Sequence, residues 1–514
     1  MSEKLPVIRV GTVPLKIEDV LALAHGRARA ALDSSPELLA RIEQSNEVLN
    51  KKLSAGFTIY GVSTGFGDSC TNKVSPELAL QMPHNLLRYH GCGTGRIFAP
   101  LQATAITAVR LAALGRGYSG ARRVLLQRLC DFINLGIAPQ IPEEGSVGAS
   151  GDLTPLSYLA AAIIGEREVF FRGEPMTAAQ ALAKAGLEPL ALGPKESLAL
   201  MNGTSVMTAL GCFVFDKAKR LARLSAAITA LASDAMRGEP AHFDDRIFAL
   251  KPHPGQRMVA RWIAEGLDFV PGQTPQAVRV QDRYSIRCAP HVIGVLVDAL
   301  PAARKTLEIE INSVNDNPII DPETGDILHS GNFYGGHVCF AMDGLKNAVA
   351  NLADLHDRQL ALLCNECFSN GLPANLVAVK GPEFAVHQGY KAMQITASAL
   401  TAEALKLTMP ASVFSRSTEC HNQDKVSMGT IAARDAVRVL ELTERVAIIT
   451  LMACCQAIDI RGPETCRPRT RQIHAAVREV SPLLLSDRRL DLDIVKVLEA
   501  WNAGALGVGE AGEP

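Results

Sequence analysis

The sequence predicts a mainly α-helical protein whose core is a bundle of long helices. In several stretches the apolar residues recur every three or four positions over many turns, which is the period of a helix with one buried face. Small residues, such as Ala226-Ala227 and Ala432-Ala433, lie on two of these stretches and would let neighbouring helices pack closely. Patterns typical of β-strands are short and few.

The predicted elements follow one another along the chain without linkers or repeats. Runs of β-branched and aromatic residues beside turn residues predict two strands, Val7–Val10 and Glu168–Phe171. The final long helix should stop at Gly462-Pro463, because proline cannot continue a helix. The predicted long helices are Leu101–Leu135, Ser205–Arg237, Pro290–Ile311, Val338–Cys367, Phe384–Leu407 and Ser427–Ile460.

Composition limits the class of protein. The 514 residues carry a net charge of −1, so electrostatics do not favour nucleic acid or an anionic membrane as a partner. The first residues lack the apolar stretch of a signal peptide, and the uncharged run Ser197–Phe215 is expected to be a buried helix rather than a membrane span. The twelve cysteines are scattered, which predicts reduced thiols in a cytoplasmic protein.

The sequence contains no pattern typical of a metal site. Cys364-Asn365-Glu366-Cys367 is a single CxxC pair without a second pair or nearby histidines, and it favours helix packing over zinc binding. The twelve histidines show no HExxH spacing. We therefore expect a protein without a metal.

The run Gly148-Ala149-Ser150-Gly151-Asp152 contains a tripeptide that can become an electrophile. Attack of the Gly151 nitrogen on the Ala149 carbonyl would close a five-membered ring. Loss of one water from that ring, and of the Ser150 hydroxyl as a second, would leave a methylene on a conjugated imidazolone. Gly151 has no Cβ to obstruct the attack, and Gly148 frees the preceding backbone. Such a group would supply the electrophile that many enzymes take from a cofactor.

The longer string at residues 145–156, GSVGASGDLTPL, resembles the signature of the aromatic amino acid ammonia-lyases. This family comprises the histidine, phenylalanine and tyrosine lyases and the related aminomutases. The resemblance implies that Ala149, Ser150 and Gly151 form the family's methylidene-imidazolone (MIO) group, with no metal or exogenous cofactor. A glycine- and serine-rich turn before a helix is the alternative interpretation, but the full string is far more specific than Ala-Ser-Gly alone.

The resemblance extends over nearly the whole chain and implies an architecture. It points to a histidine ammonia-lyase-like (L-aspartase-like) fold, with an N-terminal domain over residues 1–200 that carries the MIO group. Residues 201–514 would form the helical-bundle core and the C-terminal helical region. Members of the family assemble as homotetramers in which three chains contribute to each active site, so we expect a homotetramer with shared sites.

Two further motifs match residues that act on the substrate in the family. Residues 60–67 read YGVSTGFG, and the matching tyrosine, here Tyr60, removes the β-proton of the substrate. A phenol is a base only as phenolate, so we expect positive charge or hydrogen bonds to lower its pKa. Residues 201–205 read MNGTS, and the matching asparagine, Asn202, contacts the MIO carbonyl, where negative charge develops.

Two later motifs match residues that hold the amino acid. In residues 280–288, VQDRYSIRC, Arg287 matches the arginine that grips the substrate carboxylate, and Gln281 and Tyr284 match residues near the amine and the MIO group. In residues 330–335, SGNFYG, Asn332 matches a second carboxylate contact and Phe333 an aromatic wall.

Two positions bear on the choice of substrate. In residues 422–428, NQDKVSM, Gln423 follows Asn422 and matches a glutamate that histidine lyases direct at imidazole, whereas phenylalanine and tyrosine lyases carry glutamine. The pair Tyr89-His90 differs from the common Phe-Leu, His-Leu and Ser-His pairs of the three lyases. Both side chains can pair with a substrate phenol, which phenylalanine lacks, so the pocket should favour tyrosine.

The sequence therefore predicts an MIO-dependent ammonia-lyase for an aromatic L-amino acid, with L-tyrosine converted to trans-p-coumarate and L-phenylalanine to trans-cinnamate as a side or alternative activity. Three alternatives remain open. A histidine ammonia-lyase would release urocanate, and an aromatic 2,3-aminomutase would return ammonia to give a β-amino acid. A non-catalytic helical scaffold would lack the MIO group.

Overall fold

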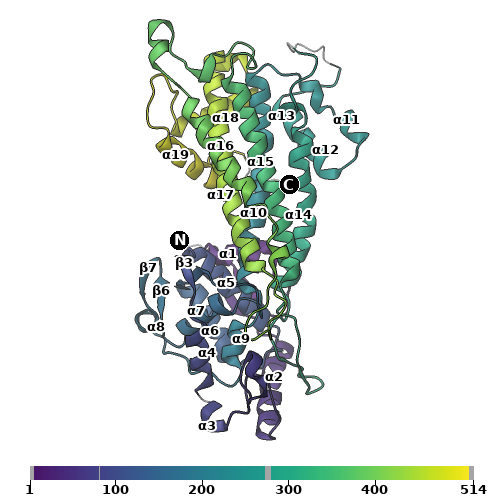
Figure 1. Cartoon of the computed structure of the whole chain (residues 1–514), viewed down its shortest axis with the longest axis vertical. Coiled ribbons are helices and arrows are strands. Elements are labelled where there is room, and N and C mark those ends of the chain that lie inside the picture. The colour runs from purple at the N-terminus through teal and green to yellow at the C-terminus, as the bar shows by residue number, and fades with distance from the viewer. Residues whose placement is uncertain (1–4, 80, 273–278, 509–514) are drawn as a thin grey trace. The chain divides into compact units, whose positions relative to one another are not determined.

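The computed structural model describes residues 5–79, 81–272 and 279–508. It is mainly helical, which confirms the predicted fold class, and the longest helices stand out as extended rods in Figure 1. The chain divides into two compact units. Unit 1 comprises Met1–Phe213, Ala303–Asp343 and Pro410–Arg434, and unit 2 comprises Val214–Ala302, Gly344–Met409 and Asp435–Pro514. The expected domain boundary near residue 200 stays a prediction.

Unit 1 combines short helices with small sheets. Strands β1 and β2 pair in parallel, β3 pairs with β5, and β4, β6 and β7 form an antiparallel three-stranded sheet. Its elements are β1 (Val7–Val10), α1 (Ile17–Ala24), β2 (Arg29–Leu32), α2 (Pro36–Ser54), η1 (Gly67–Thr71), α3 (Pro76–Ala79), α4 (Met82–His90), β3 (Thr94–Ile97), α5 (Pro100–Leu114), α6 (Arg123–Leu135), β4 (Ile137–Pro139), β5 (Pro142–Glu144), α7 (Leu153–Ile163), β6 (Glu168–Phe171), β7 (Glu174–Thr177), α8 (Ala178–Ala185), α9 (Glu196–Met201), β8 (Ile319–Ile320), β9 (Ile327–Leu328) and η5 (Ala411–Phe414).

The core of unit 1 surrounds helix α5. This helix is apolar on nearly every side and packs against α1 and α6. It carries a single charged side chain, Arg110, in the middle of the core. Helix α7 is likewise buried from Pro155 to Ile163. The tripeptide lies immediately before α7, which gives it a rigid support on its C-terminal side.

Long helices dominate unit 2. Buried polar side chains join them: the Gln359 amide on α15 donates to Thr229 on α10 at 2.9 Å, and the Thr450 hydroxyl on α17 donates to the His356 carbonyl on α15 at 3.3 Å. The elements of unit 2, including four helices that begin or end in unit 1, are α10 (Ser205–Ala235), η2 (Pro240–Phe243), α11 (Asp245–Ala249), α12 (Pro254–Gly266), α13 (Tyr284–Arg287), α14 (Ala289–Ile311), α15 (Gly336–Cys364), η3 (Ala374–Leu376), η4 (Gly381–Val386), α16 (Lys391–Lys406), α17 (Gly429–Arg461), η6 (Pro463–Thr465), α18 (Pro468–Val480) and α19 (Asp491–Asn502).

Four of the predicted long helices agree with α10, α14, α15 and α17 to within a few residues, and both predicted strands are confirmed as β1 and β6. A single helix over Leu101–Leu135 is wrong. The chain turns between α5 and α6, where Gly117 and Gly120 adopt φ of +81° and +66°, values that only glycine takes without strain. The helix expected from Phe384 begins later, at Lys391, after a 3₁₀ turn and Gly389.

The uncharged run Ser197–Phe215 is buried, as expected, but it is not one helix. Helix α9 ends at Met201 and α10 begins at Ser205, and Gly203 between them has a φ of +150°. Among the residues that the structure describes, seven further short strands also escaped prediction, because segments of two to four residues show too little alternation of apolar and polar residues to be recognised as strands.

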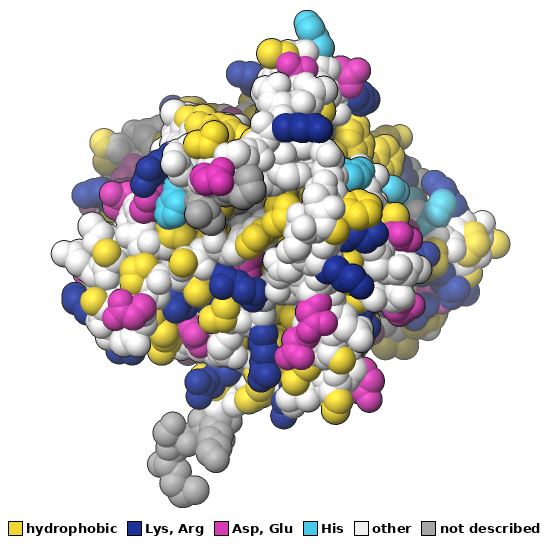
Figure 2. All heavy atoms as spheres, turned by 90° about the horizontal axis from the view of Figure 1, so that it is seen from below, with side chains coloured by type: hydrophobic (Ala, Val, Ile, Leu, Met, Phe, Trp, Pro, Cys, Tyr) yellow, Lys and Arg dark blue, Asp and Glu magenta, His cyan; other side chains and the backbone are white. Residues whose placement is uncertain are grey.

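The surface charge and the hydropathy of the helices agree with a balanced composition. On the face seen in Figure 2, basic and acidic side chains are interspersed, in keeping with a net charge of −1. Among the residues that the structure describes, one helical stretch, Tyr284–Ile311, has the length and mean hydropathy, 1.3, that a membrane span would need, a test that core helices of other proteins also pass.

Candidate active site

The tripeptide lies against the break between α9 and α10. The Asp152 N–H donates to the Gly203 carbonyl at 2.8 Å, and Gly151 and Gly203 form a parallel bridge. A Cβ on Gly151 would lie 2.2 Å from the Gly203 oxygen, so glycine is required there. The helix break that the sequence did not predict is therefore the wall on which the tripeptide rests.

The backbone of the tripeptide is already sharply turned. Ser150 and Gly151 both have positive φ, +50° and +77°, an arrangement that a non-glycine residue such as serine rarely adopts. On the other side, a Cβ on Gly148 would lie 2.2 Å from the Ser427 hydroxyl, so this glycine also sits in a space without room for a side chain. A tight turn between two close contacts fits the ring closure that the sequence implies.

Asn202 contacts the oxygen that ring closure would turn into the ring carbonyl. Its Nδ2 donates to the Ser150 carbonyl oxygen at 2.7 Å. The ring would contain the Ala149 carbonyl carbon, the Ser150 nitrogen, Cα and carbonyl carbon, and the Gly151 nitrogen, so the Ser150 oxygen becomes the ring carbonyl. The residues present therefore fit the MIO group: a turned tripeptide with a donor on that oxygen.

Asp152 anchors the tripeptide from its C-terminal side. Its fully buried carboxylate accepts hydrogen bonds from the Val206 and Met207 N–H groups at 2.9 and 3.1 Å, at the start of α10, and from the Thr430 hydroxyl. Burial raises the pKa of Asp152 to about 6, against these hydrogen bonds, which lower it. The side chain thus ties α7, α10 and α17 together at one point.

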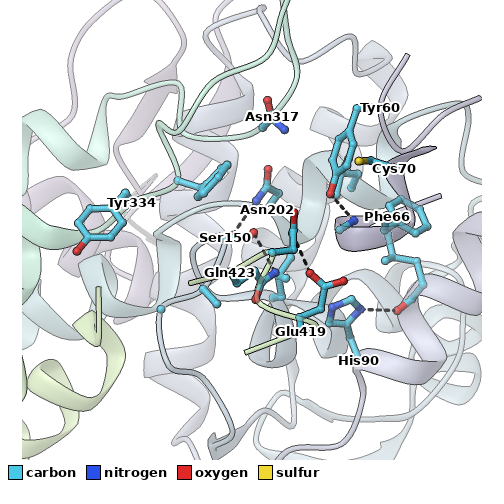
Figure 3. Close-up of a pocket in the computed structure, with 18 of the residues that line it drawn as sticks. Tyr60, Phe66, Cys70, His90, Ser150, Asn202, Asn317, Tyr334, Glu419 and Gln423 are labelled. Carbon is cyan, nitrogen blue, oxygen red and sulfur yellow. Dashed lines mark hydrogen bonds between the residues drawn. The ribbon is translucent and has the colours of Figure 1, made fainter. Parts of the chain in front are cut away.

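Tyr60 faces the same cavity from the loop before η1. Its hydroxyl oxygen accepts a hydrogen bond from the Gly67 N–H at 2.8 Å, which Figure 3 shows beside Phe66. Burial raises the pKa of Tyr60, the Gly67 N–H lowers it, and the charge of Glu419 raises it further. The expected hydrogen bond that lowers this pKa is present, but burial outweighs it, so the expectation of a pKa below the usual value is wrong.

A cavity of about 410 Å³ joins these groups within unit 1. Figure 3 shows Asn202, Ser150 and Gln423 converging at its centre, with Tyr60 on one side and Tyr334 on the other. The predicted site residues that line the cavity are Tyr60, Tyr89, His90, Ala149, Ser150, Asn202, Phe333, Asn422 and Gln423.

His90 lies at the side of this cavity with Tyr89. Its Nδ1 lies 3.1 Å from the Leu86 carbonyl, and because a carbonyl can only accept, Nδ1 carries the proton and Nε2 of the neutral ring keeps its lone pair. Burial lowers the pKa of His90, so the neutral ring prevails at neutral pH. The Tyr89 ring, 4.3 Å away between centroids, packs against the imidazole.

The segment that carries Asn422 and Gln423 also carries an acidic group. The Gln423 Nε2 donates to the Ser150 hydroxyl at 3.3 Å, whereas the Asn422 Nδ2 donates to Glu419 at 2.8 Å. The other oxygen of Glu419 accepts the Asp68 N–H at 2.8 Å, so this carboxylate links the Tyr60 loop to the loop before α17. Gln423 thus touches the reactive serine itself.

Five predicted site residues do not line the cavity, and one of them is Gly151, whose backbone forms the bridge to Gly203. Asn332 is exposed and donates to the Val314 carbonyl at 3.2 Å. Gln281, Tyr284 and Arg287 belong to unit 2, where the Arg287 Nε donates to the Asp282 carbonyl at 2.9 Å and its guanidinium lies 4.7 Å from the Tyr284 ring centroid.

Several lining residues were not predicted from the sequence. Glu419 stands four positions before Gln423, so an acidic residue beside a quoted motif was the available signal. Other lining residues lie inside the quoted motifs without having been predicted as site residues: Phe66, Gly67, Gly148, Leu153, Tyr334, Asp424 and Lys425. The remaining ones lie outside those motifs: Cys70, Leu86, Leu198, Asn317 and His329. No cluster of three or more His, Cys, Asp or Glu side chains suited to a metal occurs among the described residues, and within the CxxC pair Cys364 is buried at the end of α15 while Cys367 is exposed.

Comparison with known proteins gives a consistent result. The family model described as aromatic amino acid lyase matches residues 15–479. Histidine ammonia-lyase of Geobacillus thermodenitrificans is 40% identical over 94% of this chain and 95% of that protein.

Solved structures similar to this chain include proteins of the same kind as the relatives identified by sequence. Tyrosine aminomutase from Streptomyces globisporus superposes with a TM-score of 0.90 at 36% identity, covering 98% of this chain and 97% of that one. Histidine ammonia-lyase from Trypanosoma cruzi gives a TM-score of 0.87 at 32% identity, covering 97% and 94%. These likenesses confirm the expected histidine ammonia-lyase-like fold.

Proposed function

Because the chain belongs to the aromatic amino acid lyase family, we propose that it is a carbon–nitrogen lyase that removes ammonia from an aromatic L-amino acid with the help of an MIO group formed from Ala149, Ser150 and Gly151. The observation that supports this most strongly is the hydrogen bond from Asn202 to the Ser150 carbonyl, in a cavity that also holds Tyr60. When present, the MIO group supplies the electrophile that makes the substrate amine a better leaving group.

The side chains of the chain then have separate tasks. Tyr60 is the base for the β-proton, and the Gly67 N–H on its oxygen stabilises the phenolate that this task requires. The Asn202 amide stabilises negative charge on the oxygen it touches, as a donor in an oxyanion hole does. Phe333 provides an apolar wall for the aromatic ring.

We propose that Arg287 binds the substrate carboxylate, with Asn332 as a second contact and with Gln281 and Tyr284 near the amine. Family resemblance supports these four assignments. It also supports a homotetramer in which neighbouring chains complete each site, and a location in the cytoplasm.

For the substrate we propose L-tyrosine, converted to trans-p-coumarate, with L-phenylalanine converted to trans-cinnamate as a side reaction. The supporting observation is the neutral His90 in the cavity wall, whose Nε2 lone pair can accept a hydrogen bond from a phenol. Phenylalanine would leave that acceptor unpaired, which costs about 1–3 kcal/mol.

Two other activities have support of their own, and the names of similar proteins favour them more directly than a tyrosine lyase. The relative in Geobacillus thermodenitrificans is a histidine ammonia-lyase, and an imidazole N–H could also donate to His90. The similar structure from Streptomyces globisporus is a tyrosine aminomutase, which shares the proposed amino acid and differs in the product.

A parallel assay of the purified protein separates these activities. L-Tyrosine, L-phenylalanine and L-histidine are each supplied, and ammonia, the unsaturated acid and any β-amino acid are quantified by chromatography. Coumarate and ammonia in equal amounts as the fastest products would support the tyrosine lyase. Urocanate as the fastest product would identify a histidine lyase, and a β-amino acid without matching ammonia an aminomutase.

A further inference from the structure

The strongest unexplained feature of the fold is a fully buried arginine behind the tripeptide. Arg110, in the middle of the apolar helix α5, has no exposed surface. Its Nη1 donates to the backbone carbonyl of Asn202 at 2.9 Å, but its Nε and Nη2 have no hydrogen-bond partner among the described residues. A buried guanidinium with unmet donors is costly, and it calls for a functional explanation.

The guanidinium is packed directly against the backbone that supports the tripeptide. A Cβ on Gly203 would lie 2.0 Å from Arg110 Nη1, and a Cβ on Gly151 would lie 2.2 Å from the Gly203 oxygen. Arg110, Gly203 and Gly151 therefore form a stack with no space for a methyl group at either contact. Movement of the first member would be passed to the third, because interiors packed this closely transmit displacement.

The same contact fixes Asn202. Arg110 holds the backbone oxygen of Asn202 while the Asn202 side chain donates to Ser150. The charge of the guanidinium is balanced within the core, since Asp316 and Asp152 both interact with it, and burial lowers its pKa only to about 10. Arg110 is therefore a cation at neutral pH.

Resting on the function proposed above, we propose that Arg110 is a positioning residue that holds Asn202 and Gly203 against the tripeptide, so that the MIO ring closes and the Asn202 amide stays on the ring carbonyl. In that closure the Gly151 nitrogen bonds to the Ala149 carbon, and the Ala149 oxygen leaves as water with the protons of the Gly151 and Ser150 nitrogens. The Ser150 Cα proton and hydroxyl leave as the second water. No oxidant or reductant is consumed.

The test compares the intact mass of full-length variants at equal times after synthesis. Arg110→Met removes the donors, Arg110→Lys keeps a cation that can reach the Asn202 carbonyl, and Arg128→Met is a matched control. Arg128, on α6, is also a nearly buried arginine that donates to a backbone carbonyl, that of Glu188 at 2.6 Å, but it does not touch Asn202 or Gly203. Near-ultraviolet absorbance of the conjugated ring gives a second readout.

The proposal predicts that Arg110→Met slows the loss of two waters about a hundred-fold, the scale of an ångström-sized misplacement, and that Arg110→Lys restores most of it. Arg128→Met should lose both waters at the wild-type rate even if its melting temperature falls. In Arg110→Lys chains that have lost both waters, kcat should fall with KM unchanged, because Arg110 does not touch substrate.

Loss of both waters at the wild-type rate in soluble Arg110→Met would overturn the proposal. If that variant is insoluble, a wild-type kcat in soluble Arg110→Lys that has lost both waters would overturn it instead. A wild-type chain that keeps its full mass would instead refute the MIO group, and with it the proposed function, so the two failures are distinguishable.

Discussion

The side-chain amide of Asn202 donates a hydrogen bond to the backbone carbonyl of Ser150 at 2.7 Å, across 52 residues of sequence. The partner is the oxygen that would become the carbonyl of the MIO ring. Negative charge accumulates on this oxygen when the conjugated methylene is attacked. The donor that stabilises this charge is therefore already in place before the reaction begins.

Replacement of Asn202 should therefore reduce the rate of the chemical step. We expect Asn202→Ala to lower kcat by about 10²–10³, the range found when one oxyanion-hole donor is removed. Steady-state kinetics per mole of chain that has lost two waters gives the measurement. A kcat within a few-fold of the wild type would show that the amide does not stabilise the reacting oxygen.

The pH dependence of kcat/KM should show the ionisation of Tyr60. The phenolate is the active form of the base, and burial and Glu419 raise its pKa above the usual 10. A raised pKa for a group that acts when deprotonated moves the rising limb of kcat/KM to higher pH, so activity should still increase between pH 8 and about 10. The pH profile of the wild-type enzyme tests this.

Two variants support the assignment of that limb. Tyr60→Phe should abolish turnover while the loss of two waters remains complete. Glu419→Gln removes a negative charge near the phenol, so the limb should move to lower pH. A limb that Glu419→Gln leaves in place would mean that another group titrates.

His90 should control the choice between tyrosine and phenylalanine. In His90→Leu a substrate phenol loses its acceptor and phenylalanine no longer leaves one unpaired, so the ratio of kcat/KM for tyrosine over phenylalanine should fall about 10–10² fold. Competition between the two substrates in one reaction measures this ratio. An unchanged ratio would assign selectivity to other residues of the cavity wall.

Shared active sites can be tested by complementation. Tyr60→Phe and Arg287→Met chains, each inactive alone, are co-expressed so that they assemble together. If Tyr60 and Arg287 of one site come from different chains, roughly a quarter of the sites in random mixed oligomers contain both wild-type residues. Activity near that fraction supports the proposal, and no activity in purified mixed oligomers would place both residues in one chain.

The helices that the sequence predicted well have a continuous apolar period and clear ends. Helix α17 keeps its stripe to Arg461, and Gly462-Pro463 then stops it. The helical spacing of apolar residues also continues through Gly117 and through Gly203, where the backbone turns. The two breaks were missed because the spacing of apolar residues indicates which residues are buried and not which backbone angles they adopt.

The sequence predicted only those site residues that belong to recognisable motifs. Tyr60, Ser150 and Asn202 stand in recognisable strings, and the structure brings them to one cavity. Arg110 and Glu419 make their contacts with residues 92 and 351 positions away in sequence, so no motif predicts their roles. The available signals were indirect: Arg110 is a charged residue in the middle of an apolar helix, and Glu419 stands four positions before Gln423.

The central claim is that Ala149, Ser150 and Gly151 become an electrophile, and the intact mass of the purified wild-type chain tests it most directly, with Ser150→Ala as the reference that has no hydroxyl to lose. We predict a wild-type mass lower than that of the translated sequence by two water molecules, and a Ser150→Ala chain that does not show this loss. A wild-type chain with the full mass of the translated sequence would contradict the account.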